Sequence, residues 1–542
     1  MKKIKIILVT FLTCLCGCSS GQVASTPQSS TIATSEPVEN YNTIELQDIG
    51  SFYESENNDS FKTATNIYTN YALKIFKDAY KDNEENSLIS PYSLFAALSI
   101  LSNGTNNDTK KLLETFLGMS VDDLNKFNSD IQSQMYDIGN ANGLWFNLGT
   151  GLTLKDSFKE TVGNYYGLDS LKESDFTNNI SNVVSEVNDW AKTKSNETID
   201  NIISESDIND RTCFLLLNAL SSTAKWIDTF ESNNTYTQEF HNLDGSIGNA
   251  TMMHMEVDGY WHTDTCEGFV KDLNNGTAFV GILPNEDIDF DEFVSNLDTE
   301  TIMNLIDGKI SYDDEGKEVA DFHITRLAFP KFKYDNEYSL SDHLKELGLS
   351  SLFTEADFTN MVDGDSEKVK LLIVDEVKQK TNVEVNEEEV KMSAVTVVQG
   401  QLGNAGPPVN YVYHDVTFDR PFMFMLIDNC YFSDSRLMLI LDETEYAHFP
   451  LFIGSISYMN DEEVIEQNSS ASDVIGQCYI NVDAIKVRTA PNLSAEQVDV
   501  ATVGQLKDVY EVVENDGYTW YRIGEDNWIA SDGSWVSYTP YN

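Results

Sequence analysis

Residues 86–104 read NSLISPYSLFAALSILSNG, and this stretch decides the fold. Ser90 is a good helix N-cap, because its hydroxyl oxygen can accept a hydrogen bond from the free N–H groups of the first turn. Pro91 suits the first helical position, where no N–H is needed. The stretch therefore predicts a capped helix that begins at Pro91.

Helical and strand patterns mix on both sides of this stretch. Residues 183–190 carry apolar side chains at helical spacing. Ser339 and Asp342 form a capping box that predicts a second helix, with Gly348 as its stop. Short apolar runs predict buried strands at 213–220, 278–283, 371–374, 422–427 and 437–441. Helical patterns cluster early and strand runs late, which favours an α+β fold over regular βαβ alternation.

The chain is strongly acidic. Of its 542 residues, 88 are acidic and 35 are basic, which gives a net charge of -53. Such a surface repels phosphates and argues against DNA or RNA as a partner. Solubility explains the excess of acids, and a preference for basic partners is a second explanation. Hydrophobic residues make up 41% of the chain, enough for a sizeable core.

Residues 1–17 have the character of an export signal. Three lysines in the first five residues precede an apolar run that is too short to span a bilayer as a helix. The run ends in Leu-Cys-Gly-Cys at residues 15–18, which resembles the bacterial lipobox. The resemblance implies cleavage before Cys18 and a lipid on its sulfur, which would hold the exported protein on the outer face of the membrane. An ordinary signal peptide with an accidental cysteine is the alternative.

Composition divides the rest of the chain. Residues 18–57 are polar and lack periodic apolar side chains, and so predict a flexible tether. Residues 58–459 are steadily globular, 460–477 are a polar linker, and 478–542 consist of short alternating segments typical of a small all-β module.

Cysteine usage indicates neither a metal site nor a disulfide framework. No CxxC or Cys/His spacing occurs, and the cysteines beyond the export signal are far apart. We expect these to be buried free thiols. The seven cysteines are at positions 14, 16, 18, 213, 266, 430 and 478.

Further motifs accompany the stretch 86–104 over about 400 residues. They are, in order, Asn140-Ala141-Asn142 before Leu144-Trp145, Val187-Asn188-Asp189-Trp190, Asn218-Ala219 before Trp226 and Phe230, Asp244-Gly245-Ser246 before Met252-Met253, Phe279 to Pro284, Phe329-Pro330-Lys331-Phe332, Ala356-Asp357-Phe358, Glu384-Val385-Asn386-Glu387, Asp419-Arg420-Pro421-Phe422 and Phe452-Ile453-Gly454. One such match is weak, but the ordered series closely resembles the serpin family. The resemblance implies a fold with a large mixed sheet, a gap in that sheet and a long exposed loop.

The resemblance also implies a function. A peptidase attacks the exposed loop as a substrate and forms an acyl-enzyme. The cut loop then enters the large sheet as a new strand and drags the tethered peptidase across the body, which distorts the active site of the peptidase. The native state is kinetically trapped, because the sheet would be more stable with the loop inside it. In this chain the loop lies between Glu387 and Pro421.

The first half of this loop has the pattern of a strand. Residues 390–398, VKMSAVTVV, alternate, and no proline or charge falls on the set that would face inward. We expect this segment to be able to enter the sheet, and an ordinary exposed hairpin strand is the alternative. The residues that correspond to the hinge of the family are Glu387, Glu388, Glu389, Val390, Lys391, Met392, Ser393 and Ala394.

The hinge departs from the pattern of the family at three positions. The family usually has glycine at Glu389, a small polar residue at Val390 and alanine at Met392. Glu389 lacks the backbone freedom of glycine, and a bulky Met392 must fit beneath the sheet. These departures would slow insertion, and they favour a substrate or a non-inhibitory binding protein as the alternative function.

Contacts around the gap are also implied by the resemblance. Gln379 replaces the shutter histidine of the family and can still donate and accept hydrogen bonds, with Ser90 and Asn218 as its matched partners. Lys331 matches the partner of Glu387, so a salt bridge is expected at the base of the loop. The breach and shutter positions are Ser90, Asn218, Trp226, Lys331 and Gln379.

Two positions for the scissile bond remain open. Counting from the hinge gives Gly403–Asn404, whereas aligning Pro407-Pro408 with a proline pair of some family members gives Asn404–Ala405. The scissile region is Leu402, Gly403, Asn404 and Ala405, and no Arg or Lys lies between 392 and 419. A trypsin-like target is therefore disfavoured. An elastase-like or subtilisin-like serine peptidase, or a cysteine peptidase, fits better.

The C-terminal module has a resemblance of its own. Residues 485–491, IKVRTAP, look like the opening strand of bacterial SH3-like domains, although the family has glycine at Ala490. Such domains commonly bind cell-wall peptides or glycans. The tryptophans at 520, 528 and 535 are either part of such a surface or part of the core, and the core is favoured for any one of them.

Catalytic alternatives lack their motifs. No HExxH, GxSxG or Walker pattern occurs, and the histidines stand at 241, 254, 262, 323, 343, 414 and 448. A cell-wall hydrolase, suggested by the C-terminal module, lacks its Cys/His framework. We therefore expect a surface-held peptidase inhibitor that is not an enzyme and uses no cofactor or metal.

Overall fold

The computed structural model describes most of the chain in two compact units, Met1–Glu462 and Glu463–Asn542. The described residues are 6–18, 42–55, 57–81, 85–135, 138–195, 201–209, 212–310, 322–387, 411–431, 446–460, 476–482, 484–495, 497–502, 506–524 and 527–540. The first unit combines helices with mixed sheets, and the second is built from strands. The first unit therefore has the α+β fold expected from the sequence.

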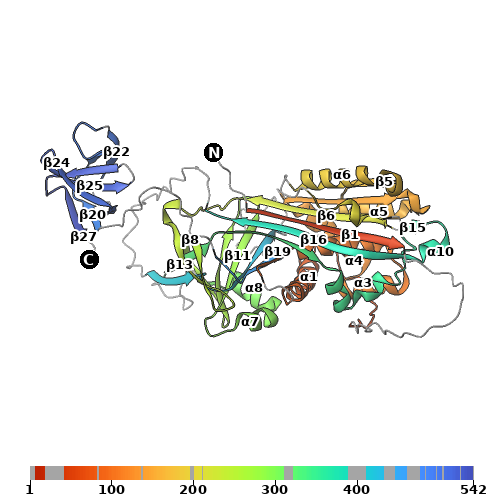
Figure 1. Ribbon diagram of the computed structural model, residues 1–542. Coiled ribbons are helices and arrows are strands. Elements are labelled where there is room, and N and C mark those ends of the chain that lie inside the picture. The colour runs from red at the N-terminus through yellow and green to blue at the C-terminus, as the bar shows by residue number, and fades with distance from the viewer. Residues whose placement is uncertain are drawn as a thin grey trace, which may run out of the picture. The chain divides into compact units, whose positions relative to one another are not determined.

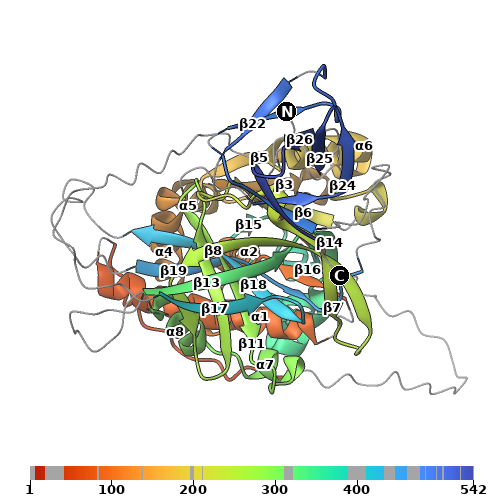
Figure 2. The ribbon, with the colours of Figure 1, turned by 90° about the vertical axis from the view of Figure 1, so that its left-hand side faces the viewer.

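The first unit is organised around three main sheets, shown in Figures 1 and 2. The large sheet has the strand order β14 (Phe332–Ser339), β16 (Leu372–Val385), β1 (Ile6–Cys18), β6 (Thr212–Ala224), β3 (Ile138–Asn147) and β5 (Leu168–Ser174). The core sheet has the order β12 (Lys309–Ile310), β9 (Tyr260–His262), β10 (Cys266–Asp272), β11 (Thr277–Pro284), β18 (Phe422–Tyr431), β19 (Tyr446–Ile456) and β2 (Ser87–Ile89). The outer sheet, whose strands run across the front of Figure 2, has the order β17 (Tyr411–Thr417), β13 (Phe322–Pro330), β8 (Ile247–Asp258) and β7 (Thr235–His241). A short pair, β4 (Thr153–Leu154) and β15 (Val362–Asp363), lies apart from these sheets.

Helices cover both faces of the large sheet. Figure 1 shows α1, α3 and α4 on one side of the sheet and α6 on the other. The helices are α1 (Asn58–Tyr80), α2 (Pro91–Gly104), α3 (Asn107–Leu117), α4 (Val121–Gln134), α5 (Asp156–Tyr166), α6 (Phe176–Lys194), α7 (Phe290–Asn296), α8 (Thr299–Asp307), α9 (Ser341–Leu344) and α10 (Ser366–Val369). The main core lies among α1–α5 and the sheets, and a smaller core joins α6 to β3 and β6.

Helix α2 forms as the sequence predicts. It begins at Pro91, and the side chain of Ser90 caps it by accepting a hydrogen bond from the N–H of Ser93. Every residue of the helix except Asn103 is buried, because α2 lies inside the main core. A Cβ on Gly104 would lie 2.7 Å from Cε of Met361, so the close packing of that methionine requires glycine at the helix end.

Most of the predicted elements are confirmed. The runs 213–220, 278–283, 371–374 and 422–427 fall in or at the start of β6, β11, β16 and β18, and residues 183–190 fall in α6. The run 437–441 lies outside the described residues. Cys213, Cys266 and Cys478 are buried free thiols, as expected. No helix within the described part of the chain has both the length and the apolar character needed to cross a membrane.

The predicted capping box at Ser339 is wrong. Ser339 ends β14, where it pairs with Lys378 of β16, and α9 begins only at Ser341 after Leu340. The ladder of β14 occupies the backbone of Ser339, so the strand overrides the local capping signal. Gly348 does leave the helical conformation, with φ of +105°.

The predicted tether differs from the structure in its last part, because residues 42–55 pack against the first unit. Both the backbone N–H of Phe52 and that of Tyr53 donate to the carboxylate of Asp123, over 3.0 and 3.1 Å. Tyr53 is 1% exposed, and its hydroxyl donates to Asp130. Asp123 lies in the first turn of α4, where a carboxylate is stabilised by the helix dipole. The composition of the segment could not predict this contact, because its partner lies elsewhere in the chain.

Strand β1 contains the residues predicted to be an export signal. It lies between β16 and β6 and runs antiparallel to both. Its register places Val9 opposite Asn382 and Cys18 opposite Leu372 on β16. Residues 6–18 therefore occupy a position between β6 and β16, and export remains a prediction.

The second unit is an all-β module of two small sheets. One has the order β23 (Leu506–Val509), β20 (Gly476–Ile480) and β27 (Val536–Pro540). The other has the order β22 (Gln497–Ala501), β21 (Ile485–Arg488), β26 (Asn527–Ser531), β25 (Tyr518–Gly524) and β24 (Glu511–Asn515). Trp520 and Trp528 are buried and Trp535 is partly buried, so the favoured core assignment holds for these rings.

Candidate functional site

The end of β16 leads into the predicted loop. Val385 is the last residue of the strand and pairs with Phe332 of β14. The described chain continues to Glu387 and resumes at Tyr411, the first residue of β17. The hinge residues 388–394 and the scissile region 402–405 lie outside the described residues, so the site is described from the two ends of the loop.

An ion pair and a hydrogen bond to the backbone help to hold the loop base, which we define as Asn386 and Glu387. The amine of Lys331 lies 2.9 Å from one carboxylate oxygen of Glu387 and 3.1 Å from the other. The side chain of Glu387 is only 12% exposed, which strengthens the pair relative to a surface ion pair. The indole N–H of Trp226 donates to the carbonyl of Asn386 over 3.0 Å. The expected ion pair is therefore present, and Trp226 adds a bond to the backbone beside it.

Trp226 is held in turn by a group of rings. It is 2% exposed, and its ring centroid lies 5.4 Å from Phe279 and 5.7 Å from Phe230, both at steep angles. The amine of Lys271 lies 5.7 Å from the centroid of Trp226 and 5.5 Å from that of Phe230. The sequence analysis did not identify Lys271 as a residue near the loop. It is a single lysine within the strand β10, and no local pattern predicts that it is buried.

The contact predicted between Gln379 and Ser90 is present at the middle of the large sheet. Gln379 accepts from the backbone N–H of Ser90 over 3.0 Å and donates to the backbone carbonyl of Ser90 over 2.9 Å. The hydroxyl of Ser90 donates to the carbonyl of Leu451 in β19. Gln379 is 1% exposed, so this side chain ties β16 to the start of α2 and, through Ser90, to the core sheet.

Asn218 does not reach Gln379, contrary to the expectation from the resemblance. The register places residue 12 of β1 opposite both Asn218 and Gln379, so one full strand separates them. Asn218 instead donates to Asn140 and Asn142 of β3, each over 3.0 Å.

The other end of the loop enters the outer sheet beside a column of aromatic rings. The imidazole of His414 in β17 shares a 2.9 Å hydrogen bond with His323 of β13 and stacks on Tyr260 at 3.8 Å. His262 stacks on the same tyrosine at 4.9 Å. Burial, followed by the charges of His323 and His262, lowers the pKa of His414. The sequence did not predict that these three histidines lie close together, because they belong to three separate strands.

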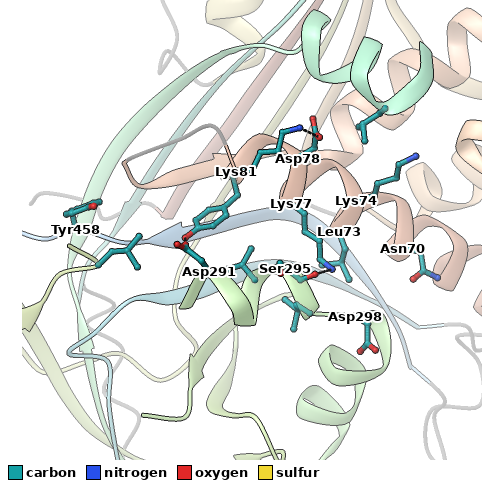
Figure 3. A pocket seen from close by; sticks show the side chains of 15 residues that line it. Asn70, Leu73, Lys74, Lys77, Asp78, Lys81, Asp291, Ser295, Asp298 and Tyr458 are labelled. Carbon is teal, nitrogen blue, oxygen red and sulfur yellow. Dashed lines mark hydrogen bonds and ion pairs between the residues drawn. The ribbon is translucent and has the colours of Figure 1, made fainter. Parts of the chain in front are cut away.

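A cavity of about 1040 Å³ lies between α1 and α7 (Figure 3). Its polar groups largely join the two helices to each other and to their surroundings. The amine of Lys77 donates to the carbonyl of Ser295, the hydroxyl of Tyr80 donates to Asp291, and Lys81 binds Asp78. Of the predicted site residues that the structure describes, none lines this cavity.

Within the described residues, no three or more His, Cys, Asp or Glu side chains are arranged to hold a metal ion. The groups described around the loop base contact one another through a hydrogen bond to the backbone, the ion pair of Lys331 with Glu387, and ring packing. Such an arrangement can hold a backbone segment at one end of a sheet.

Comparisons with known proteins agree with this geometry. Residues 66–433 match the sequence profile of the family described as Serpin (serine protease inhibitor). An uncharacterized serpin-like protein of Methanosarcina mazei is 25% identical over 469 residues, covering 83% of this chain and 99% of that protein. Serpin-ZX of Arabidopsis thaliana is 28% identical over 358 residues, covering 64% of this chain and 88% of that protein.

A solved structure shares the fold. The thermophilic serpin tengpin in its native state has a TM-score of 0.58 to this chain at 27% identity, and the match covers 77% of this chain and 97% of tengpin. The profile match extends over more than half of the chain and includes the loop base, Gln379 and Trp226. The chain therefore belongs to the serpin family, a family of peptidase inhibitors and not of enzymes.

Proposed function

We propose that this serpin inhibits elastase-like or subtilisin-like serine peptidases, or cysteine peptidases, by inserting its cut loop between β6 and β16. One observation carries the proposal: those two strands accept an additional antiparallel strand between them, since β1 pairs with both. The large sheet is thus able to bind one more strand at the place where the loop would enter.

The polarity of β1 is the polarity that the loop requires. The chain leaves β16 at Val385 and must reverse direction to return along the same strand. A returning segment would lie antiparallel to β16, with its first residues near Asn382 and its later residues near Leu372. β1 runs in that direction, from Val9 to Cys18. The alternating segment 390–398 is long enough to replace most of this pairing.

Trapping then follows from a competition of rates. The peptidase forms an acyl-enzyme with the carbonyl carbon of the residue before the cut, and water would normally release it. If the loop enters the sheet before water attacks, the tethered peptidase is carried along the sheet and its active site is distorted. The loop base must therefore be held well enough to keep the loop out before cleavage, and loosely enough to let it enter afterwards.

The class of target is inferred from the loop itself. Leu402, Gly403, Asn404 and Ala405 are small or uncharged, and no Arg or Lys lies between 392 and 419. Peptidases with small or apolar pockets accept such residues, whereas a trypsin-like pocket needs a positive side chain. Both candidate bonds, Gly403–Asn404 and Asn404–Ala405, are compatible with this class.

Export to the outer face of the membrane, as we propose it, would remove most of β1. Cleavage before Cys18 during export would remove every residue of β1 except its last. The exported protein would then have an unoccupied place between β6 and β16, and a lipid on Cys18 would hold it on the outer face of the bacterial membrane. The C-terminal unit, which we propose to be SH3-like, would bind cell-wall peptides or glycans.

Mixing the protein with pancreatic elastase or subtilisin tests the proposal. An inhibitor gives a covalent complex that survives boiling in detergent, and mass spectrometry of the released fragment identifies the cut bond. A cut chain without complex would contradict inhibition and would favour a non-inhibitory surface-binding serpin. The chain lacking residues 1–17 should be tested beside the full chain, because β1 would compete with the loop.

A further inference from the structure

Lys271 is a buried charge beside the loop base that the proposed mechanism does not use. It belongs to β10, is 6% exposed, and has its amine 5.7 Å from the ring centroid of Trp226 and 5.5 Å from that of Phe230. Among the described residues, no carboxylate lies within ion-pair distance of this amine; Asp228 and Asp272 attract it from farther away. Lysine is rarely buried without a partner, so this placement requires an explanation.

The ring beneath the amine is the ring that holds the loop. Trp226 places its indole N–H 3.0 Å from the carbonyl of Asn386, the residue before Glu387. A cation within about 6 Å of an indole centroid is attracted to the ring and draws electron density toward itself. The N–H of a ring polarised in this way is a stronger hydrogen-bond donor. The three groups, ammonium, indole and carbonyl, therefore form one connected line from β10 to the loop base.

We propose that the protonated side chain of Lys271 is a positioning group for the loop base: it fixes the ring of Trp226 and strengthens its bond to Asn386. The contribution of that bond to holding the loop out of the sheet rests on the proposed function. The positioning of Trp226 by Lys271 does not rest on it.

The environment of Lys271 makes this contact sensitive to pH. Burial lowers the pKa of Lys271 to about 8, and the attraction of Asp228 and Asp272 offsets only part of the effect. Near the loop base, Lys331 and Glu387 are paired with each other, and Glu384, which accepts a hydrogen bond from the side chain of Asn386, is paired with Lys333. Deprotonation above pH 8 removes the cation and weakens the bond of Trp226 to Asn386, while a neutral amine stays in the same place.

The first experiment records the fluorescence of Trp226 in the full chain between pH 6 and pH 10, as the difference between each protein and its Trp226→Phe counterpart. The expected wild-type signal changes with a midpoint near pH 8. Lys271→Arg keeps a permanent charge, and so should hold the low-pH signal throughout. Lys271→Met has no charge, and should hold the high-pH signal throughout.

The second experiment measures the exchange of the Trp226 indole proton by NMR at pH 7. The expected exchange is about five-fold faster in Lys271→Met than in the wild type, as for a weakened cation–ring contact. Lys271→Arg should exchange at about the wild-type rate. Comparing the proteins at one pH removes the intrinsic effect of pH on exchange.

Two outcomes would overturn the proposal. One is an arginine variant whose signal still changes near pH 8, because another group would then be titrating. The other is a methionine variant whose indole proton exchanges as slowly as that of the wild type. If Lys271→Met does not fold, the pH dependence of the fluorescence in Lys271→Arg alone tests the proposal, since this variant preserves the charge. Neither experiment uses a peptidase, so failure of inhibition and failure of this proposal remain distinguishable.

Discussion

The loop base and the middle of β16, which both border the space between β6 and β16, are built from different interactions. At the loop base, an ion pair and an indole–carbonyl bond hold residues that would have to move when the loop enters the sheet. At Gln379, a buried neutral side chain binds the backbone of Ser90 at the start of α2. The loop base is thus a releasable contact, whereas Gln379 anchors one wall of the space to the core. Under the proposed function, insertion would begin by breaking the contacts at the loop base.

Removing β1 should have the largest effect on this comparison. In a chain lacking residues 1–17, the space is free, so cutting the loop should raise the melting temperature by about 10 °C or more as the loop enters. In the full chain the same cut should raise it far less, because β1 already pairs with both walls. Thermal unfolding before and after treatment with elastase measures both values. Equal gains in the two chains would show that β1 does not occupy the place of the loop.

Replacing Gln379 should have the next largest effect. Gln379→Met preserves most of the volume but leaves the N–H and the carbonyl of Ser90 without their partner in a buried site. The expected loss in the free energy of unfolding is about 2–4 kcal/mol, measured by urea denaturation. Lys380→Met, at the next position of β16, breaks a partly exposed ion pair with Glu337 and serves as the control, with an expected loss below about 1 kcal/mol. Similar losses in the two variants would argue against the anchoring role of Gln379.

Breaking the ion pair of the loop base should have a smaller effect on stability. Lys331→Met leaves Glu387 without its partner, but Lys331 is 36% exposed, so solvent reduces the cost to about 1 kcal/mol. Hydrogen exchange at residues 384–387 should increase, because the loop base is released more often. The matched control is Lys333→Met, which removes a more exposed pair with Glu384. Unchanged exchange in the Lys331 variant would contradict the role given to this pair.

Acidification should reduce the local stability of β17, at the other end of the loop, and this effect should be the smallest of the four. The pKa of His414 is lowered by burial and by His323 and His262, so the unfolded chain takes up a proton at a higher pH than the folded chain does. The stabilisation is therefore complete above the unfolded pKa of about 6.5 and is lost as the pH falls below it. Hydrogen exchange of residues 411–417, corrected for the intrinsic effect of pH, should rise between pH 7.5 and pH 5. His414→Gln should remove most of this rise in exchange. If the exchange of the variant still rises as the pH falls, His414 is not the group whose protonation causes it.

The sequence predicted well those features that depend on short segments. The N-cap at Ser90, the helix over 183–190 and the buried apolar strands were readable, because periodicity and capping act within a few residues. The order of motifs identified the family, and the family pattern in turn placed Lys331 opposite Glu387. The capping box at Ser339 failed because pairing with Lys378, which is distant in sequence, overrode a local preference.

Features that depend on packing between distant segments were not predictable. Asp123 holds residues 52 and 53 from across the chain, although composition alone assigned them to a tether. Asn218 and Gln379 are separated by a strand that comes from the N-terminus. The burial of Lys271 depends on rings contributed by other parts of the chain. None of these contacts leaves a periodic or local signature in the sequence.

The sequence alone identified the family and the α+β architecture, and it predicted a loop with an uncharged centre between Glu387 and Pro421. It could do so because these properties reside in ordered motifs and in the identity of single residues. In the structure, residues 411–417 at the end of this predicted loop form the strand β17. Only the tertiary structure decided which strand stands beside Gln379, that Trp226 binds the carbonyl of Asn386, and that a lysine lies beneath that ring. These are contacts between segments far apart in the chain, and their geometry arises only when the sheets pack.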